Sequence, residues 1–202
     1  MKIWAWGAAL AVGLSGCAHA ADEAQPAAAA PKAAGVEKPA ERLPTDVRRA
    51  TIIVRDMEKS LALYRDVIGL QVNYDTTVQT SGVALPAGEP GATARLVLLN
   101  ANDPWVGWLG LMEWVDPPIP AGDYRKRMGP GDVVLILNTD DAEKRCEMVK
   151  GLEGITFTAE ARLQVYEGRG GGPDIRVMGC NFFDPDGVLI ELNQIVVREE
   201  RV

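Results

Sequence analysis

Two glutamates lie inside runs of apolar residues of the kind that form β-strands. Glu191 falls in VLIEL, directly after the turn sequence DPDG, and Glu113 falls in LGLMEWV. A charge in a buried strand is costly unless it is paired or bound to something. Each glutamate therefore faces solvent, has a cationic partner, or lines a site in which it could act as a base or a metal ligand.

Aromatic and basic side chains could complete such a site. Trp105 and Trp108 stand close together, and aromatic walls suit a planar or apolar ligand, although packing in the core would also explain them. Arg176 could anchor an anionic ligand, or it could pair with one of the 28 acidic residues. These three residues are candidates for binding and not for catalysis.

The elements that must position these residues follow the order β-α-β-β-β, and this order occurs twice. In the first copy Asp56 can cap a helix that ends before Gly69, and in the second copy Asp140 and Glu143 form a capping box before a second helix. An offset of 85 residues superposes the two helices and their flanks without a gap. The predicted strands are 50–54, 71–74, 95–100 and 109–115, then 132–138, 155–165, 175–183 and 188–192.

An internal duplication of this kind is a strong signal of architecture. The sequence predicts an α+β fold in which two tandem βαβββ repeats, about 46–116 and 131–196, form curved mixed sheets around a shared cavity. Glu113 and Glu191 both end the last strand of their repeats but are only 78 residues apart. The first repeat should therefore contain about seven extra residues, which we place in the Gly/Pro-rich stretch 81–91.

The N-terminus predicts export. Lys2 and the apolar run 3–14 resemble a signal peptide that is too short to span a membrane. LSGC, ending at Cys17, resembles a bacterial lipobox in which the cysteine is lipidated, whereas Ala18-His19-Ala20 would permit release of a soluble periplasmic or secreted protein. Residues 18–45 are Ala/Pro-rich and read as a disordered tether, which favours a lipid anchor in the cell envelope. Residues 197–202 form a short tail.

Charge and residue counts exclude several classes of function. The net charge is −7 and there are no basic clusters that would bind nucleic acid. The only histidine precedes the predicted domain, so a nucleophilic triad or a site with two histidines cannot form there. Cys146 and Cys180 could form one disulfide in an oxidising compartment, or they could be two buried unpaired thiols.

Two stretches, VRDMEKSLALYRDVIGL (54–70) and FFDPDGVLIEL (182–192), resemble the vicinal oxygen chelate superfamily, which includes glyoxalase I, extradiol dioxygenases and bleomycin-binding proteins. The resemblance implies metal ligands on the first and last strands of each repeat, usually His and Glu. It places Glu113 and Glu191 at the last-strand positions. Arg49 and Val134 stand at the first-strand positions, and neither side chain binds a divalent cation.

The resemblance leaves three interpretations of the glutamates open. Arg49 could replace the metal and neutralise Glu113 and Glu191, both glutamates with water could hold a hard divalent cation, or both could be solvated. We expect an exported, lipid-anchored protein that binds a small molecule between the repeats without a cofactor, and a homodimer is open. The alternative is a divergent glyoxalase-like lyase or isomerase that uses Glu113, Glu191 and Arg49 with Mg²⁺, Mn²⁺, Zn²⁺ or Ni²⁺; extradiol dioxygenase chemistry is disfavoured.

Overall fold

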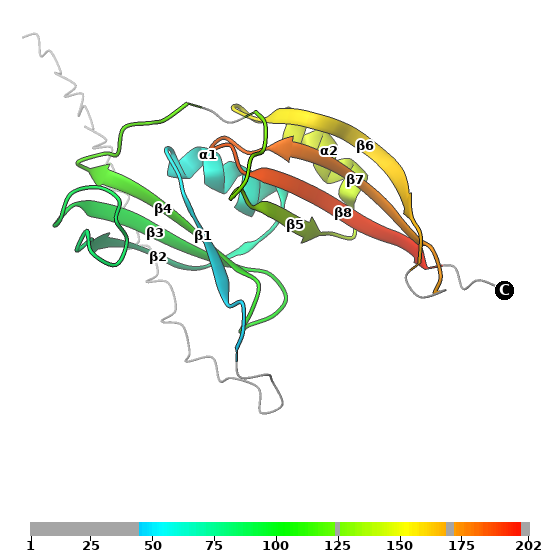
Figure 1. The fold of residues 1–202 in the computed structure, drawn as a ribbon, viewed down its shortest axis with the longest axis horizontal. Coiled ribbons are helices and arrows are strands. Elements are labelled where there is room, and N and C mark those ends of the chain that lie inside the picture. The colour runs from blue at the N-terminus through cyan, green and yellow to red at the C-terminus, as the bar shows by residue number, and fades with distance from the viewer. Residues whose placement is uncertain (1–44, 124–125, 169–171, 199–202) are drawn as a thin grey trace, which may run out of the picture. The chain divides into compact units, whose positions relative to one another are not determined.

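A computed structural model of the chain describes residues 45–123, 126–168 and 172–198 (Figure 1). The predicted signal peptide, the lipobox with Cys17 and most of the tether lie outside these residues, as does the end of the tail. Within the described part of the chain, no helix combines the length and apolar character needed to cross a membrane.

Each repeat forms one four-stranded mixed sheet, which confirms the predicted α+β class. The sheets have the orders β1-β4-β3-β2 and β5-β8-β7-β6, and in each the first strand pairs in parallel with the last. The first repeat contains β1 (Arg49–Ile53), α1 (Met57–Leu61), η1 (Ala62–Val67), β2 (Gln71–Gln79), β3 (Thr93–Asn100) and β4 (Trp108–Asp116). The second contains β5 (Val134–Asn138), α2 (Ala142–Lys150), β6 (Thr156–Tyr166), β7 (Ile175–Phe183) and β8 (Leu189–Arg198).

The two helices begin in different ways. The Asp56 carboxylate caps α1 as predicted, accepting hydrogen bonds from the backbone N–H groups of Glu58 and Lys59. The predicted capping box of the second helix is wrong: α2 begins after Asp141, whose side chain makes no cap bond. The Gln194 side chain of β8 accepts the hydrogen bond from the Ala142 N–H instead. A partner from another strand thus replaces the local cap.

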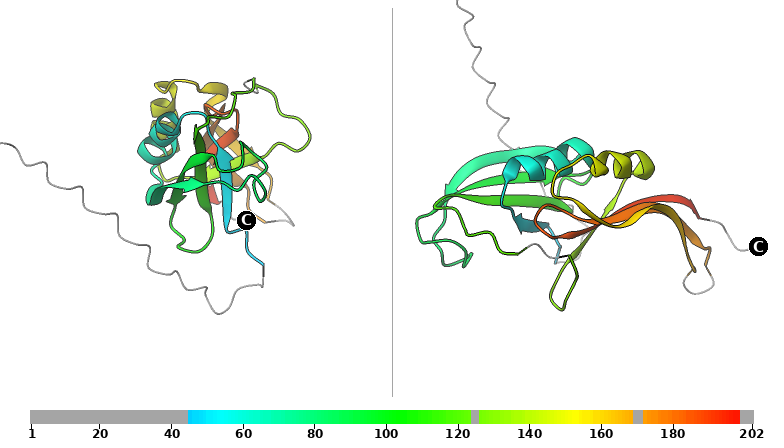
Figure 2. Two further views of the ribbon diagram at one scale, coloured as in Figure 1. Left: turned by 90° about the vertical axis from the view of Figure 1, so that its left-hand side faces the viewer. Right: turned by 90° about the horizontal axis from the view of Figure 1, so that it is seen from above.

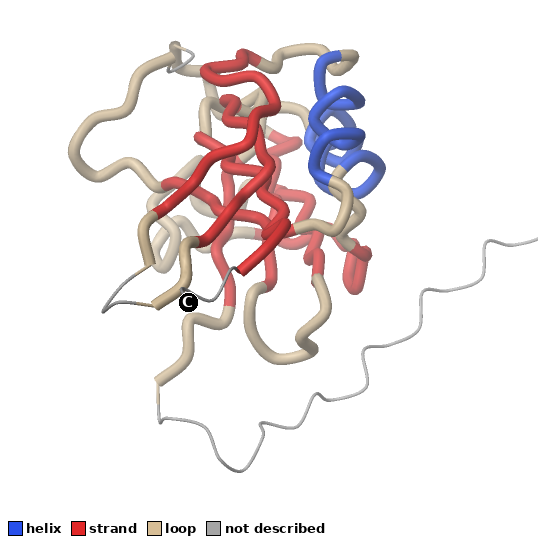
Figure 3. Tube along the Cα trace, turned by 90° about the vertical axis from the view of Figure 1, so that its right-hand side faces the viewer, coloured by secondary structure: helices blue, strands red, loops and turns tan. Residues whose placement is uncertain are grey.

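The helices cover one face of both sheets. Figures 2 and 3 show α1 and α2 on the same side of the strands. Leu109 and Leu111 of β4 and Ile190 and Leu192 of β8 point to this side and join one continuous core with the helices. Cys146 of α2 and Cys180 of β7 form a disulfide inside that core.

The opposite faces of the two sheets differ. The loop 80–92, here named the flap, covers the first sheet, and Met112 and Trp114 are buried near its end. On the second sheet Val134, Ile136 and Ile195 belong to this face, because strand neighbours such as Leu135, Leu137 and Leu192 turn toward the core. Their exposed fractions are 36%, 60% and 46%. The second sheet therefore has an open apolar face.

Candidate functional site

The turn 184–187, with the sequence DPDG, docks the second repeat onto the first. The Asp186 carboxylate is nearly buried and accepts hydrogen bonds from Nε and the backbone N–H of Arg55, each at 3.0 Å, and from Oγ of Ser60 at 3.3 Å. The buried Tyr64 hydroxyl donates to Asp184 Oδ2 at 2.6 Å. Burial raises the pKa of Asp184, whereas this hydrogen bond lowers it. These contacts fix the distance between the edge strands of the two sheets.

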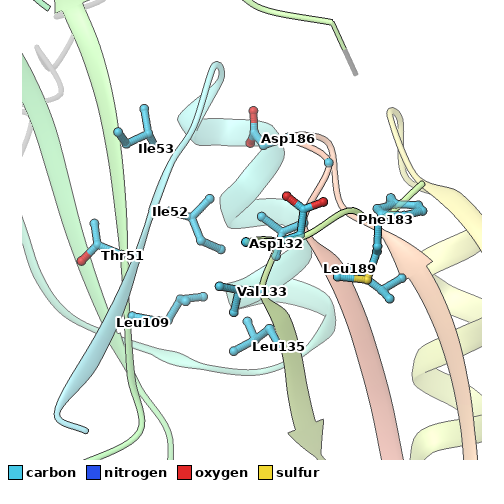
Figure 4. A pocket seen from close by; sticks show the side chains of 15 residues that line it. Thr51, Ile52, Ile53, Leu109, Asp132, Val133, Leu135, Phe183, Asp186 and Leu189 are labelled. Atoms are coloured by element: carbon cyan, nitrogen blue, oxygen red, sulfur yellow. The ribbon is translucent and has the colours of Figure 1, made fainter. Parts of the chain in front are cut away.

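A cleft of about 430 Å³ separates those edge strands, β1 and β5. We name it the inter-repeat cleft. Figure 4 shows Ile52, Leu109, Val133 and Leu135 pointing toward one another across it. Thr51 and Ile53 point away, to the other side of β1. The remaining lining includes apolar residues of the second repeat and the carboxylates of Asp132 and Asp186: Met128, Phe183, Val188 and Leu189 are its larger apolar members.

Glu113 lies on the helix side of the first sheet. Its Oε2 accepts a hydrogen bond from the backbone N–H of Met57, at the start of α1, at 3.2 Å. Desolvation by burial raises the pKa of this carboxyl group, and the Met57 N–H partly offsets that effect. Glu113 lines a second cavity, which it shares with Arg55 and Trp114 and which meets the inter-repeat cleft at Ile53 and Asp186.

Glu191 points to the opposite side, the open face of the second sheet. It neighbours Ile136 on β5 and Asn181 on β7. In the first sheet the residue paired with Thr51, the repeat counterpart of Ile136, is Gly110. The strand register therefore makes Gly110, and not Glu113, the counterpart of Glu191. Glu113 and Glu191 lie on opposite faces of their sheets and do not come together.

The other predicted binding residues are also apart from one another. Arg49 begins β1 and lies beside the flap. Trp105 donates from its indole nitrogen to Asp46, and its ring and that of Trp108 lie 4.2 and 5.6 Å from the guanidinium carbon of Arg48. Arg176 lies on β7 opposite Val165. Neither tryptophan lines the inter-repeat cleft.

The residues at the metal-ligand positions do not fit a divalent cation. The strand register places Arg49, Gly110, Val134 and Glu191 there, and only Glu191 can be a ligand. A Cβ atom at Gly110 would lie 2.7 Å from the Thr51 hydroxyl, so even space for a longer side chain is missing. Across the described ranges, no group of three or more His, Cys, Asp and Glu side chains could hold a metal ion.

Sequence reasoning missed the residues that line the inter-repeat cleft. Ile52, Val133 and Leu135 look like ordinary members of apolar strands. The available signal was that β1 and β5 are the first strands of two repeats, each without a second strand neighbour within its sheet. Which edges would meet depends on the DPDG turn and its partners in the other repeat, which are more than 120 residues away in the sequence.

Comparison with known proteins identifies relatives of this fold. The model of the glyoxalase/bleomycin resistance protein/dioxygenase superfamily matches residues 47–192. A glyoxalase family protein of Bacillus cereus has a TM-score of 0.60 at 16% identity, covering 79% of this chain and 100% of that one. No curated protein matches the sequence.

Two further solved structures are similar at lower scores. The fosfomycin resistance protein FosX of Listeria monocytogenes, solved with Mn(II) and sulfate, has a TM-score of 0.42 at 16% identity and covers 78% of this chain and 98% of its own. TnmS3, an antibiotic-binding protein of a Streptomyces species, has a TM-score of 0.39 at 21% identity, with coverages of 75% and 97%.

Proposed function

Since the chain belongs to the glyoxalase/bleomycin resistance protein/dioxygenase superfamily, we propose that it binds a small apolar molecule in the inter-repeat cleft without a metal. The observation that carries this proposal is the cleft itself. Its volume of about 430 Å³ lies within the usual range of ligand pockets, roughly 300–1,000 Å³. Apolar side chains from both repeats form most of its wall, with the Asp132 and Asp186 carboxylates among its few polar groups.

The ligand positions of the superfamily support the metal-free reading. One carboxylate, Glu191, is too few for a divalent cation, and the fixed positive charge of Arg49 in the first repeat would oppose one. The interpretation in which Arg49 neutralises both glutamates is not favoured, because Glu113 lies on the far side of its sheet.

A ligand screen by thermal denaturation tests the proposal. Ligands of the cleft should raise the melting temperature of the protein, and Val133→Asp should abolish that rise, because it places a charge in the cleft. Val165→Asp is the matched control: this valine is 58% exposed and does not line the cleft. Equal ligand responses in both variants would contradict a site in the cleft.

A divergent lyase or isomerase is the second candidate function. Glu113 favours it, because a partly buried carboxyl with a raised pKa beside a cavity has the character of a general base. Such an enzyme would need a site other than the one the superfamily uses. Metal-dependent turnover that Glu113→Gln abolishes, with the fold intact, would establish this candidate and displace the binding proposal.

The proposed address is the bacterial cell envelope, with the domain tethered through lipid on Cys17; release as a soluble periplasmic or secreted protein is the alternative. The support is the sequence LSGC and the Ala/Pro-rich stretch after it. Metabolic labelling with a fatty acid should modify the full-length protein and not Cys17→Ala. Labelling of neither protein, with both found in the soluble fraction, would favour release.

The proposed partner in solution is a second copy of the chain. The open face of the second sheet supports this, because Val134, Ile136 and Ile195 are large apolar residues left partly in water. Light scattering of the purified protein should give the mass of a dimer, and Ile136→Lys should reduce it to that of a monomer. A monomeric wild-type protein would contradict the assembly.

A further inference from the structure

We propose that the cavity beneath the flap is a second binding site, which takes a small amphipathic carboxylate through Arg49. This cavity, here named the flap cavity, has a volume of about 350 Å³. It lies between the flap and the uncovered part of the first sheet, on the side of β1 away from the inter-repeat cleft. The lining comprises Arg49, Thr51, Val78, Gln79, Thr80, Ser81, Gly82, Ala84, Leu85, Leu96 and Met112.

Arg49 carries a guanidinium without a partner. Among the described residues no side chain or carbonyl forms a hydrogen bond or ion pair with it, and it is exposed. Other arginines of the domain are engaged: Arg55 by Asp186, and Arg95 by Asp75 and Glu58. In a chain with seven more acidic than basic residues, an arginine without a partner at the wall of a cavity is a specific feature.

The charge of the lining selects for an anion. Arg49 is the only charged residue in the flap cavity, and the other polar groups are the hydroxyls of Thr51, Thr80 and Ser81 and the amide of Gln79. The other four cavities described in this part of the chain all include carboxylates. A guanidinium can bind a carboxylate through two parallel hydrogen bonds, and no carboxylate of the lining competes for it.

The rest of the wall is apolar. Leu96 and Met112 belong to the sheet, Val78 ends β2, and Leu85 of the flap completes the wall. Leu85 is 47% exposed, so the flap covers the cavity without filling it. The ligand class that matches this lining has a short hydrocarbon chain or ring and one carboxylate.

The site is independent of the inter-repeat cleft. The two cavities share only Thr51, which lies on the strand between them. The cleft contains Asp132 and Asp186, which would repel an anion. Binding of a carboxylate beneath the flap therefore does not depend on the proposed function of the cleft.

Octanoate and 1-octanol form a matched pair of probes, because they share an eight-carbon chain and differ in the carboxylate. We would titrate both, with chemical shifts observed by NMR, into the full-length chain carrying Cys17→Ala, which avoids detergent. Octanoate should bind more tightly than octanol. Arg49→Gln should weaken octanoate binding at least about tenfold, as expected for loss of a charge-assisted hydrogen bond, and leave octanol unchanged.

Arg48→Gln is the control, since it makes the same change in charge one residue away, in a side chain that stacks on Trp105 and does not line the cavity. Leu85→Asp should also weaken octanoate binding, whereas Val133→Asp should not. An equal effect of Arg48→Gln and Arg49→Gln would mean a general charge effect and overturn the proposal. Sensitivity to Val133→Asp alone would place the anion in the cleft and overturn it as well.

Discussion

At the scale of single residues, the faces of two glutamates decide the chemistry. Sequence alone correctly identified Glu191 as the last-strand position, because it follows the DPDG turn at a fixed distance. It assigned Glu113 to the same position in the first repeat, where the register places Gly110. The three-residue difference turns the side chain to the other face of the sheet. The repeats differ in loop length, so no gap-free alignment could have fixed this register.

Glu113 should make stability depend on pH. Its pKa in the folded state is raised above the ordinary value of 4.5, so its contribution to stability is present below that pH and is lost as the pH rises through the raised pKa. Glu113→Gln does not titrate. The free energy of unfolding of the variant, relative to wild type, should therefore rise between about pH 4 and pH 7. Urea denaturation at the two pH values measures this; a constant difference would contradict it.

At the scale of elements, the contact between the repeats depends on the DPDG turn. Asp186→Ala should lower the free energy of unfolding by about 3 kcal/mol, because it leaves Arg55 partly buried without its carboxylate. Asp66→Ala, which removes the exposed pair with Arg65, is the control and should have little effect. Chemical denaturation measures both variants. Similar small losses would mean that the turn does not hold the repeats together.

The disulfide should stabilise the second repeat. It joins α2 to β7 across 34 residues, and restricting a loop of this size in the unfolded chain contributes about 2–4 kcal/mol. The double variant Cys146→Ala/Cys180→Ala should unfold at correspondingly lower denaturant concentration. Non-reducing peptide mapping of the wild type should recover the linked pair of cysteines; free thiols at both positions would show that the bridge does not form.

The elements themselves were largely predictable from periodicity and punctuation. The predicted strand 175–183 matches β7, and the glycines 69 and 154 have positive φ as expected after the helices. Local sequence did not reveal that the first helix continues as a π-helix over Ala62–Val67. It also placed about seven extra residues in the flap, whereas the counterpart register, 81 instead of 85 residues apart, requires only four.

At the scale of the whole domain, duplication predicts two sheets but not how they meet. The repeats have the same element order, yet their surfaces differ: the first sheet has a flap and the second an open face. Such differences arise from loops and single side chains that break the repeat. The candidate sites lie where the repeat is broken, which is why the pattern of the repeat alone did not locate them.

The central claim, metal-free binding in the inter-repeat cleft, is tested most directly by the thermal ligand screen carried out with a chelator present. The account predicts that the ligands that stabilise the wild-type protein do so equally with and without chelator, and that Val133→Asp loses the response while Val165→Asp keeps it. Stabilisation that requires Mn²⁺, Zn²⁺ or Ni²⁺ and disappears in Glu191→Ala would contradict the claim and return the protein to the metal-dependent members of its superfamily.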